Sequence, residues 1–195
     1  MLDFQQAGEK PEGIEMVVLT RIEKMQREDM QRVMELDKQS FNTPWHESAY
    51  LTELANSSAY YIVARIGERI VGYSGMWVIM DEAHITTVAV EPKTRGKKVG
   101  EQLLISTLEE AARRGARRVT LEVREHNEVA QRLYRKYGFA PASIRRGYYT
   151  DNGEDAVVMT IYDLLSPTYQ ANFRRLKRLL TEQAEREPQP IGVPR

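Results

Sequence analysis

The stretch VAVEPKTRGKKVGEQLL, residues 88–104, changes its periodicity halfway along and decides the fold around it. Its first residues close a strand-like run that starts at His84 and is stopped by Glu91-Pro92. From Val99 onward the apolar side chains recur three or four residues apart, which is the spacing of one helical face. Gly115 then supplies a helix end. The stretch therefore predicts a strand, a basic turn and an amphipathic helix.

The turn Thr94–Gly100 joins that strand to the helix and carries a glycine among three cationic side chains. Free backbone N–H groups and the helix dipole favour an anion at such a helix start, so a diphosphate fits here. The P-loop pattern and the GxGxxG dinucleotide pattern are both absent from the turn. An ordinary basic surface turn is the competing interpretation.

Periodicity and turn signals divide the rest of the chain into further elements. The predicted strands cover residues 16–22, 60–66, 69–80, 84–90, 118–124, 139–149 and 156–164. The predicted helices cover residues 28–39, 46–55, 99–115 and 127–137, and one more begins at Ser166-Pro167. This order favours a mixed α/β layer with a helix on each side of a central strand.

Composition narrows the class of protein. The 195 residues suit one domain with tails, and 28 basic side chains balance 28 acidic ones. A formal net charge of zero argues against electrostatic binding of DNA by the protein as a whole. The absence of cysteine excludes disulfides, cysteine-based zinc sites and thiol nucleophiles, and the three histidines lack the HExxH spacing. We therefore predict neither a DNA partner nor a metal.

Segments at the two ends differ from the middle. Residues 1–15 are acidic and contain glycines, and they lack the apolar core of a signal peptide, so we predict a flexible tail. Residues 16–164 hold the predicted domain. Residues 165–195 start with a helix signal and end in prolines, which predicts an amphipathic C-terminal helix and a disordered tail. The apolar face of that helix either packs on the domain or binds a partner.

No segment of the sequence suggests a membrane protein. The longest mostly apolar stretch, Val71–Met80, is too short to cross a bilayer. Together with the missing signal peptide, this predicts a cytoplasmic location and no membrane partner.

Three polar side chains beyond the turn form a candidate catalytic group. Glu122 interrupts an apolar strand, where burying a carboxylate is costly. Asn127 and Tyr134 are seven residues apart on one predicted helix, so they share a face about 10 Å apart along the axis. A carboxylate and a phenol suit the removal of one proton and the return of another. Taken singly, Glu122 pairing with a surface arginine and Tyr134 filling the core are the simpler interpretations.

Taken together, these segments resemble the GNAT superfamily of acetyl-CoA-dependent N-acetyltransferases. The resemblance rests on VAVEPKTRGKKVGEQLL, LEVREHNEVAQRLYRKYGF and RRGYYTDNGEDAVVM, and it covers about residues 16–164. Within the superfamily, the pattern looks like the RimI-type enzymes that acetylate ribosomal-protein alanine. The resemblance implies a central, mixed, mostly antiparallel sheet flanked by helices, here with an extra C-terminal helix.

The resemblance also implies residue roles. Glu122 matches the general base, and Tyr134 matches the general acid that protonates the leaving CoA thiolate. The acetyl-CoA site would comprise Val88, Ala89, Val90, Arg95, Gly96, Lys97, Lys98, Val99, Gly100, Glu101 and Asn127. The peptide slot would have one wall from Phe41, Pro44 and Trp45 and an opposite wall from Tyr148 and Tyr149.

Two positions depart from the family pattern. Lys98 stands where the superfamily commonly has glycine, so a required glycine conformation there would weaken phosphate binding, whereas use of its N–H alone would tolerate lysine. His126 stands where a small polar residue is common, and we interpret it as an exposed residue leading a helix.

We therefore predict an enzyme that transfers acetyl from acetyl-CoA to the α-amino group of a protein N-terminus by direct attack on the thioester. The implied partner is a ribosomal protein that begins with alanine. A GNAT enzyme acting on lysine or on a small-molecule amine is one alternative, and a degenerate, non-catalytic acyl-CoA-binding module is another. A small-amine site would gather several acids, whereas aromatic walls suit a peptide backbone.

Overall fold

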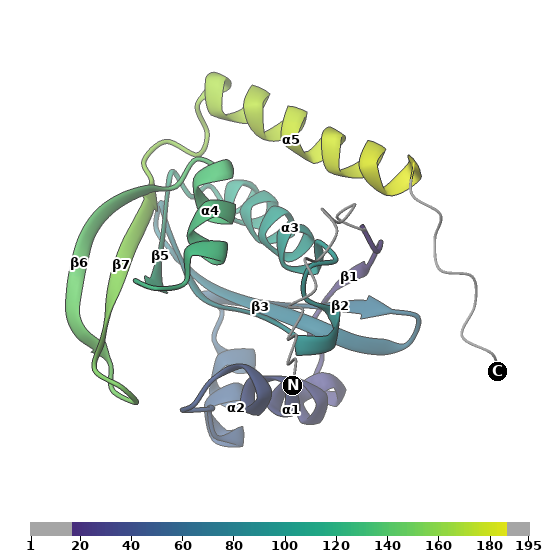
Figure 1. Ribbon diagram of the computed structural model, residues 1–195, viewed down its shortest axis with the longest axis vertical. Helices are drawn as coiled ribbons and strands as arrows, with labels where there is room; N and C mark the ends of the chain where they lie inside the picture. The colour runs from purple at the N-terminus through teal and green to yellow at the C-terminus, as the bar shows by residue number, and fades with distance from the viewer. Residues whose placement is uncertain (1–16, 187–195) are drawn as a thin grey trace, which may run out of the picture.

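The computed structural model describes residues 17–186 and folds them around one seven-stranded sheet (Figure 1). The strands are β1 (Arg21–Lys24), β2 (Ala59–Ile66), β3 (Arg69–Ile79), β4 (Glu82–Val90), β5 (Arg118–Arg124), β6 (Ala140–Tyr149) and β7 (Glu154–Ile161). They lie in the order β1-β2-β3-β4-β5-β7-β6, and β4 with β5 is the parallel pair in an otherwise antiparallel sheet. The predicted mixed, mostly antiparallel sheet is confirmed.

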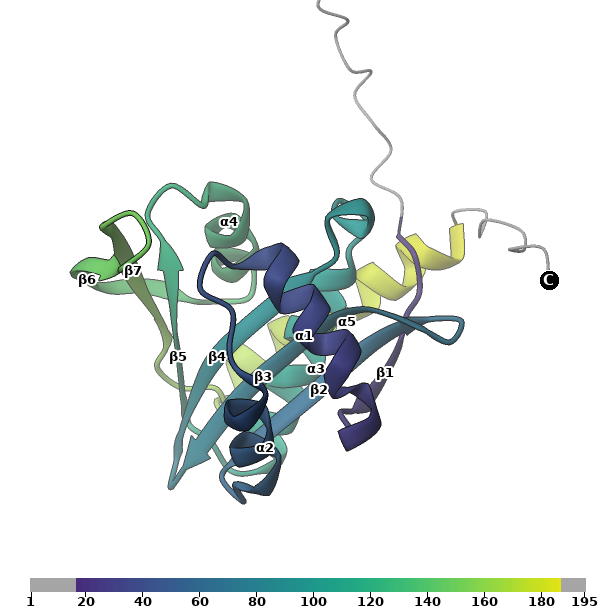
Figure 2. The same cartoon turned by 90° about the horizontal axis from the view of Figure 1, so that it is seen from below.

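Helices cover both faces of this sheet (Figures 1 and 2). They are α1 (Met30–Ser40), α2 (Glu47–Ala55), α3 (Val99–Arg113), α4 (Glu128–Lys136) and α5 (Pro167–Arg186), with short 3-10 turns at Arg27–Asp29 and Pro92–Thr94. Helices α1 and α2 lie on one face, and α3 and α4 lie on the other. The side chains of β5 can be assigned to one face or the other, because every second residue of a strand points to the same side of the sheet.

On β5 the buried residues Val119, Leu121 and Val123 pack with Leu104 and Leu108 of α3 in one core cluster. The intervening side chains of β5 therefore face the α1 and α2 side of the sheet. That side has its own smaller core, to which α1 and α2 contribute and which is separate from the first.

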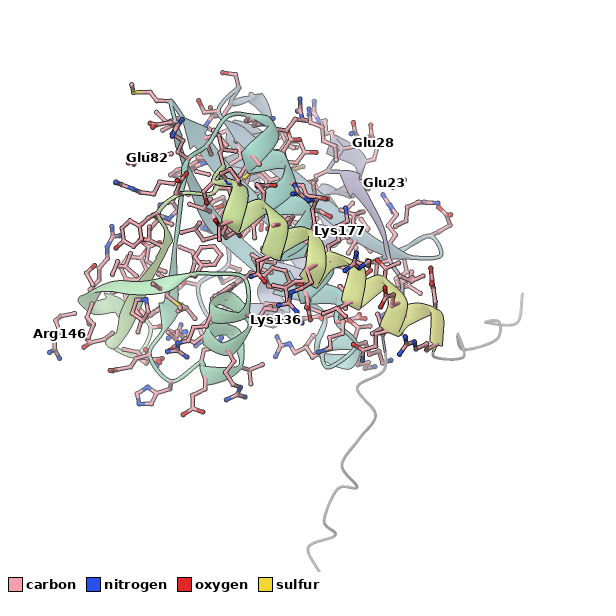
Figure 3. All side chains as sticks on the ribbon, turned by 90° about the horizontal axis from the view of Figure 1, so that it is seen from above. Glu23, Glu28, Glu82, Lys136, Arg146 and Lys177 are labelled. Carbon is pink, nitrogen blue, oxygen red and sulfur yellow. The ribbon has the colours of Figure 1, made fainter. Side chains whose placement is uncertain are left out.

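Helix α5 packs on its own domain. Of the two predicted uses of its apolar face, the structure shows packing on the domain. Phe173, Leu176 and Leu180 are buried in the same core cluster as β5 and α3. The Tyr169 hydroxyl donates to the carbonyl of Tyr137 at 2.9 Å. Figure 3 shows α5 in yellow lying across α3, from which Glu109 pairs with Lys177 at 2.5 Å. The predicted C-terminal helix is confirmed.

The first strand differs from its prediction over residues 16–22. Pairing with β2 begins only at Arg21, although Val17 and Val18 are buried. The reason is a competing partner: Gln102 of α3 donates through Nε2 to the Val18 carbonyl at 2.8 Å and accepts at Oε1 from Thr20 N at 3.0 Å. Residues 17–20 therefore run along the start of α3.

The predicted N-terminal tail, residues 1–15, and the predicted tail after the C-terminal helix lie outside the described residues. The C-terminal helix itself is described as far as Arg186. Within residues 17–186, no helix is long and apolar enough to cross a membrane.

Candidate active site

The candidate site lies where β4 and β5 separate. The two strands pair only from Glu82–Ile85 against Arg118–Leu121 within the described chain. Beyond that point β4 keeps its ladder with β3 as far as Val90, so its edge toward β5 stands open. An open strand edge presents N–H and C=O groups that need a partner. The residues predicted to hold the cofactor arm, Val88, Ala89 and Val90, all lie in this open stretch.

The predicted phosphate turn follows directly. Gly96 has φ of +78°, and a Cβ added there would meet open space, so its glycine serves the backbone conformation. The first intrahelical bond of α3 runs from Gln102 N to the Lys98 carbonyl at 3.0 Å. The N–H groups before it, including those of Val99 and Gly100, are the donors that a helix start leaves available. The turn can therefore receive an anion.

Lys98 adopts the left-handed conformation that glycine tolerates best, with φ of 61° and ψ of 11°. For a residue with a Cβ this conformation costs about 1–2 kcal/mol. The Lys98 ammonium lies 3.6 Å from Glu101 Oε2, so the side chain folds back over the first turn of α3. The position thus needs the glycine conformation, and lysine adopts it at a strain cost.

Glu101 belongs to the predicted cofactor set, but its side chain is occupied. The carboxylate is buried and accepts a hydrogen bond from the Tyr137 hydroxyl at 2.7 Å and another from Lys136 (Figure 3 labels Lys136). These contacts tie α3 to the end of α4. At Glu101 only the backbone N–H can meet a ligand without breaking that tie.

Glu122 is the first residue of β5 beyond its pairing with β4, and its side chain faces the α1 and α2 side. Its side chain is 6% exposed and has two basic neighbours. His84 Nε2 lies 2.8 Å from Oε2, and Arg145 lies 2.9 Å from Oε1. The geometry at Arg145 is unsuitable for a hydrogen bond, so Oε1 accepts none from residues 17–186.

These neighbours decide the charge of the carboxylate. Burial acts to raise the pKa of Glu122, but the hydrogen bond and charge of His84 and the charge of Arg145 outweigh it. The pKa of Glu122 consequently lies below its ordinary value, and the group is ionised at neutral pH.

Tyr134 lies on α4, on the opposite side of the sheet from Glu122. It is buried in the core cluster that contains α3 and packs against Phe139 with ring centroids 5.7 Å apart. Burial, with a smaller contribution from Tyr149, raises the pKa of Tyr134 to about 12. The phenol therefore keeps its proton at neutral pH and is present there as a proton donor.

Asn127 caps α4 as its sequence position predicts. Its Oδ1 accepts from Ala130 N at 3.1 Å, which satisfies one donor of the helix start. Capping uses only the amide oxygen, so Nδ2 is the group that could meet a cofactor. The predicted cofactor contact of Asn127 stays a prediction.

The two predicted slot walls lie on the Glu122 side of the sheet, and the loops that carry them are joined by a hydrogen bond. Phe41, Pro44 and Trp45 belong to the α1–α2 loop, where Trp45 N donates to the buried Asp37 carboxylate at 2.7 Å. From this loop Asn42 Nδ2 donates to Asp151 at the β6–β7 turn, at 2.5 Å.

The second wall is held by Arg124. Tyr148 and Tyr149 meet edge to face with centroids 5.2 Å apart, and the Arg124 guanidinium stacks on Tyr149 at 3.9 Å. The same guanidinium pairs with Asp151 at 2.9 Å and with Glu154 at 3.0 Å. The β6–β7 turn is therefore fixed to the end of β5.

Sequence reasoning missed several members of this site, namely His84, Arg145, Arg124, Asp151 and Asp37. The His84 side chain lies on the same face of the sheet as that of Glu122, but the sequence alone does not show that β4 and β5 are neighbouring strands. His126, interpreted as exposed, is exposed and lies 3.1 Å from Glu154.

The chain is similar to known acetyltransferases. The model of the acetyltransferase (GNAT) family matches residues 30–139. A Bacillus subtilis protein whose provisional name is ribosomal protein bS18-alanine N-acetyltransferase is 43% identical over 141 residues, 72% of this chain and 93% of that protein. The N-alpha-acetyltransferase RimI of Mycobacterium tuberculosis is 39% identical over 139 residues, covering 68% of this chain and 86% of that protein.

A solved structure agrees. The crystal structure of the ribosomal-protein-S18-alanine N-acetyltransferase from Escherichia coli superimposes with a TM-score of 0.69 at 26% identity. The match covers 76% of this chain and 97% of that one.

Proposed function

Since this chain belongs to the GNAT acetyltransferase family, we propose that it transfers an acetyl group from acetyl-CoA to the α-amino group of a protein N-terminus. The natural substrate in this proposal is a ribosomal protein that begins with alanine, as the names of the bacterial relatives suggest. Ribosomal proteins are made in the cytoplasm, so we propose that the reaction occurs there.

One observation carries the proposal. An ionised carboxylate and a protonated phenol flank the β4–β5 opening from opposite sides of the sheet. Glu122 Oε1 is buried beside Arg145 at 2.9 Å and accepts no hydrogen bond from the described residues, so it can accept one from an amine or a water once the half-exposed Arg145 side chain moves aside. Tyr134 lies on the α3 and α4 side, where the phosphate turn would bring the thioester.

Proton transfer in this site is coupled to bond formation. An α-ammonium group has a pKa near 7.7–8.0, whereas an ordinary glutamate has one near 4.3, so full transfer before attack costs about 4–5 kcal/mol. The lowered pKa of Glu122 makes that cost larger. The amine therefore attacks in its neutral form, and Glu122 takes the excess proton from the nitrogen once the N–C bond has formed, when that nitrogen is far more acidic.

The remaining steps use the open strand edge and the phenol. Backbone N–H groups of Val88–Val90 would stabilise the negative charge on the thioester oxygen. The CoA thiolate then leaves and receives the proton of Tyr134. The amine attacks the thioester directly, so the scheme forms no covalent enzyme intermediate.

Acetyl-CoA is the donor that this chain's residues fit. The α3 start and its basic turn would hold the pyrophosphate, the open β4 edge would hold the pantetheine arm, and Asn127 Nδ2 would contact the same arm. When bound, acetyl-CoA supplies the activated acyl group.

The slot favours a peptide chain end over a small polyamine. Its walls are aromatic, and the neighbours of Glu122 within the described residues are the basic side chains His84 and Arg145, with Arg124 behind Tyr149. A polyamine site would need several acids facing the amine. An enzyme for lysine side chains remains the second candidate, and the assay below separates the two.

The test is an acetyl-transfer assay with acetyl-CoA and short peptides whose free N-termini begin with Ala, Ser, Met or Gly. An N-terminally blocked peptide that contains lysine serves as the comparison. We expect transfer to the free α-amine, most to Ala, and loss of transfer in Glu122→Gln. Transfer to the blocked peptide would replace the proposal with a lysine acetyltransferase, and acetyl-CoA binding without any transfer would replace it with a binding module.

A further inference from the structure

His84 has no role in the transfer scheme and yet lies in direct contact with its proton acceptor. Its Nε2 atom is 2.8 Å from Glu122 Oε2. The imidazole is 38% exposed, whereas the Glu122 side chain is 6% exposed. An imidazole therefore lies between a buried carboxylate and the solvent.

Sheet register creates this contact. In the parallel pair, His84 of β4 stands opposite Thr120 of β5, two residues before Glu122. Residues two apart on a strand share a face, so the His84 side chain and the Glu122 side chain lie on the same side of neighbouring strands. One further pair, Ile85 with Leu121, follows before the strands separate, so His84 lies close to the mouth of the opening.

The imidazole ring is held from its other side. The Trp77 indole of β3 packs on it with ring centroids 6.3 Å apart. The indole N–H in turn donates to Glu53 of α2, which also accepts from the Tyr61 hydroxyl at 3.2 Å. A chain of contacts thus runs from α2 across β3 and β4 to the carboxylate on β5.

The two oxygens of Glu122 consequently differ in their surroundings. Oε2 contacts the imidazole, whereas Oε1 is buried beside the Arg145 guanidinium at 2.9 Å and accepts no hydrogen bond from the described part of the chain. We propose that His84 is a positioning residue for Glu122, holding Oε2 through its Nε2–H and thereby fixing the orientation in which the carboxylate takes the proton of the amine. This inference rests on the proposed function for the identity of that amine.

The other titratable and charged groups near Glu122 also affect its pKa, so they must be considered before the role of His84 is tested by varying the pH. Those facing the carboxylate are His84 from β4 and Arg145 and Tyr149 from β6, and Glu53 of α2 lies behind the indole that contacts His84. Removing the imidazole leaves Arg145 as the cation beside Glu122. Because burial then acts with less opposition, the Glu122 carboxylate should hold its proton to a higher pH.

The first measurement follows Glu122 itself. The side-chain carboxyl carbon is titrated by NMR in protein with ¹³C-labelled glutamate, and its signal is identified as the one lost in Glu122→Gln. We expect His84→Ala to move the titration midpoint up by about one unit. An unmoved midpoint overturns the inference, whether or not the protein is active.

The second measurement uses the peptide assay over a range of pH. We expect His84→Ala to lower kcat about ten-fold and to move the acidic limb of kcat/KM to higher pH, with KM for acetyl-CoA unchanged. His84→Gln should restore most of kcat, because its Nε2 can donate to the same oxygen. His84→Asn is too short to reach Oε2 and should behave like alanine, which keeps the test usable if His84→Ala does not fold.

A matched control separates positioning from any change on this strand. Glu82→Gln alters an exposed residue of β4 whose partner is Arg118 at 2.9 Å, and it should leave kcat and the pH profile unchanged. Equal pH profiles for wild type and His84→Ala would overturn the inference. A shifted Glu122 titration in a protein that acetylates no peptide would contradict the proposed function alone.

Discussion

Replacing Lys98 by glycine should stabilise this protein more than replacing it by alanine does. Both variants remove the ammonium group near Glu101, so their difference reports the backbone alone. Alanine keeps the Cβ that makes φ of 61° costly by about 1–2 kcal/mol, and glycine does not. Glycine gives back about 0.4–1 kcal/mol through the larger freedom of the unfolded chain.

The expected balance is about 0.5–1 kcal/mol in favour of Lys98→Gly over Lys98→Ala, or about 1–4 °C in Tm for a chain of this length. The assay is urea unfolding of both variants, followed by calorimetric titration with CoA. If the phosphate turn uses the backbone N–H of residue 98, the glycine variant should bind CoA at least as tightly as the alanine variant.

Two controls show whether the sign of the stability difference between Lys98→Gly and Lys98→Ala reports the backbone conformation. Met80 is the other residue with a side chain and a positive φ, at 56°, among those described. It is 90% exposed in the β3–β4 turn and is not among the residues proposed to bind CoA. Met80→Gly should likewise exceed Met80→Ala in stability, with CoA binding unchanged. Ala112→Gly, inside α3, should lose about 1 kcal/mol. If the Met80 pair behaves as expected while Lys98→Gly is less stable than Lys98→Ala, the left-handed conformation at Lys98 is refuted.

Three further results are expected. Tyr134→Phe should lower kcat with little change in acetyl-CoA binding, because the phenol with its pKa near 12 is the proton donor, and an unchanged kcat in steady-state kinetics would contradict that role. The pKa of Glu154 is lowered to about 2, chiefly by a backbone N–H of His126 and also by Arg124, so its contribution to stability is complete above its unfolded pKa near 4.3 and disappears as pH falls toward 2. Thermal unfolding of Glu154→Gln should accordingly differ from wild type at pH 6 and converge with it near pH 2. Phe173→Ala should cost about 3–4 kcal/mol in chemical unfolding if α5 is packed on the domain, whereas the exposed Leu179→Ala should cost less than about 0.5 kcal/mol.

Much of the fold was predictable because each element carries its own local signal. The strand at 118–124 and the helix after Asn127 were predicted to within a residue, since alternation, an N-cap and a closing glycine are short-range features. The start of β1 was not, because residues 17–20 hydrogen-bond to Gln102, which is more than eighty positions away in the chain. Local patterns carry no information about such a partner.

The candidate site divides along the same line. Glu122 and Tyr134 stand out as polar groups in apolar or helical settings, so the sequence alone indicates them. The sequence alone does not indicate Arg145 or His84, because they contact Glu122 from strands that become its neighbours only after folding. Glu101 illustrates the reverse case: its place at a helix start predicts a ligand contact, yet its carboxylate is buried against Tyr137.

The register of β5 links the chemistry to the fold. Side chains alternate along a strand, so a slip by one residue would turn Glu122 toward Leu104 and Leu108 and turn Val123 toward the slot. An unpaired carboxylate in that core costs several kcal/mol, and three apolar side chains would lose their burial at the same time. The hydrophobic pattern that the chain needs in order to fold therefore also decides which face of the sheet carries the proton acceptor. Since β4 pairs with β5 in that same register, the pattern places the His84 imidazole beside Glu122 as well.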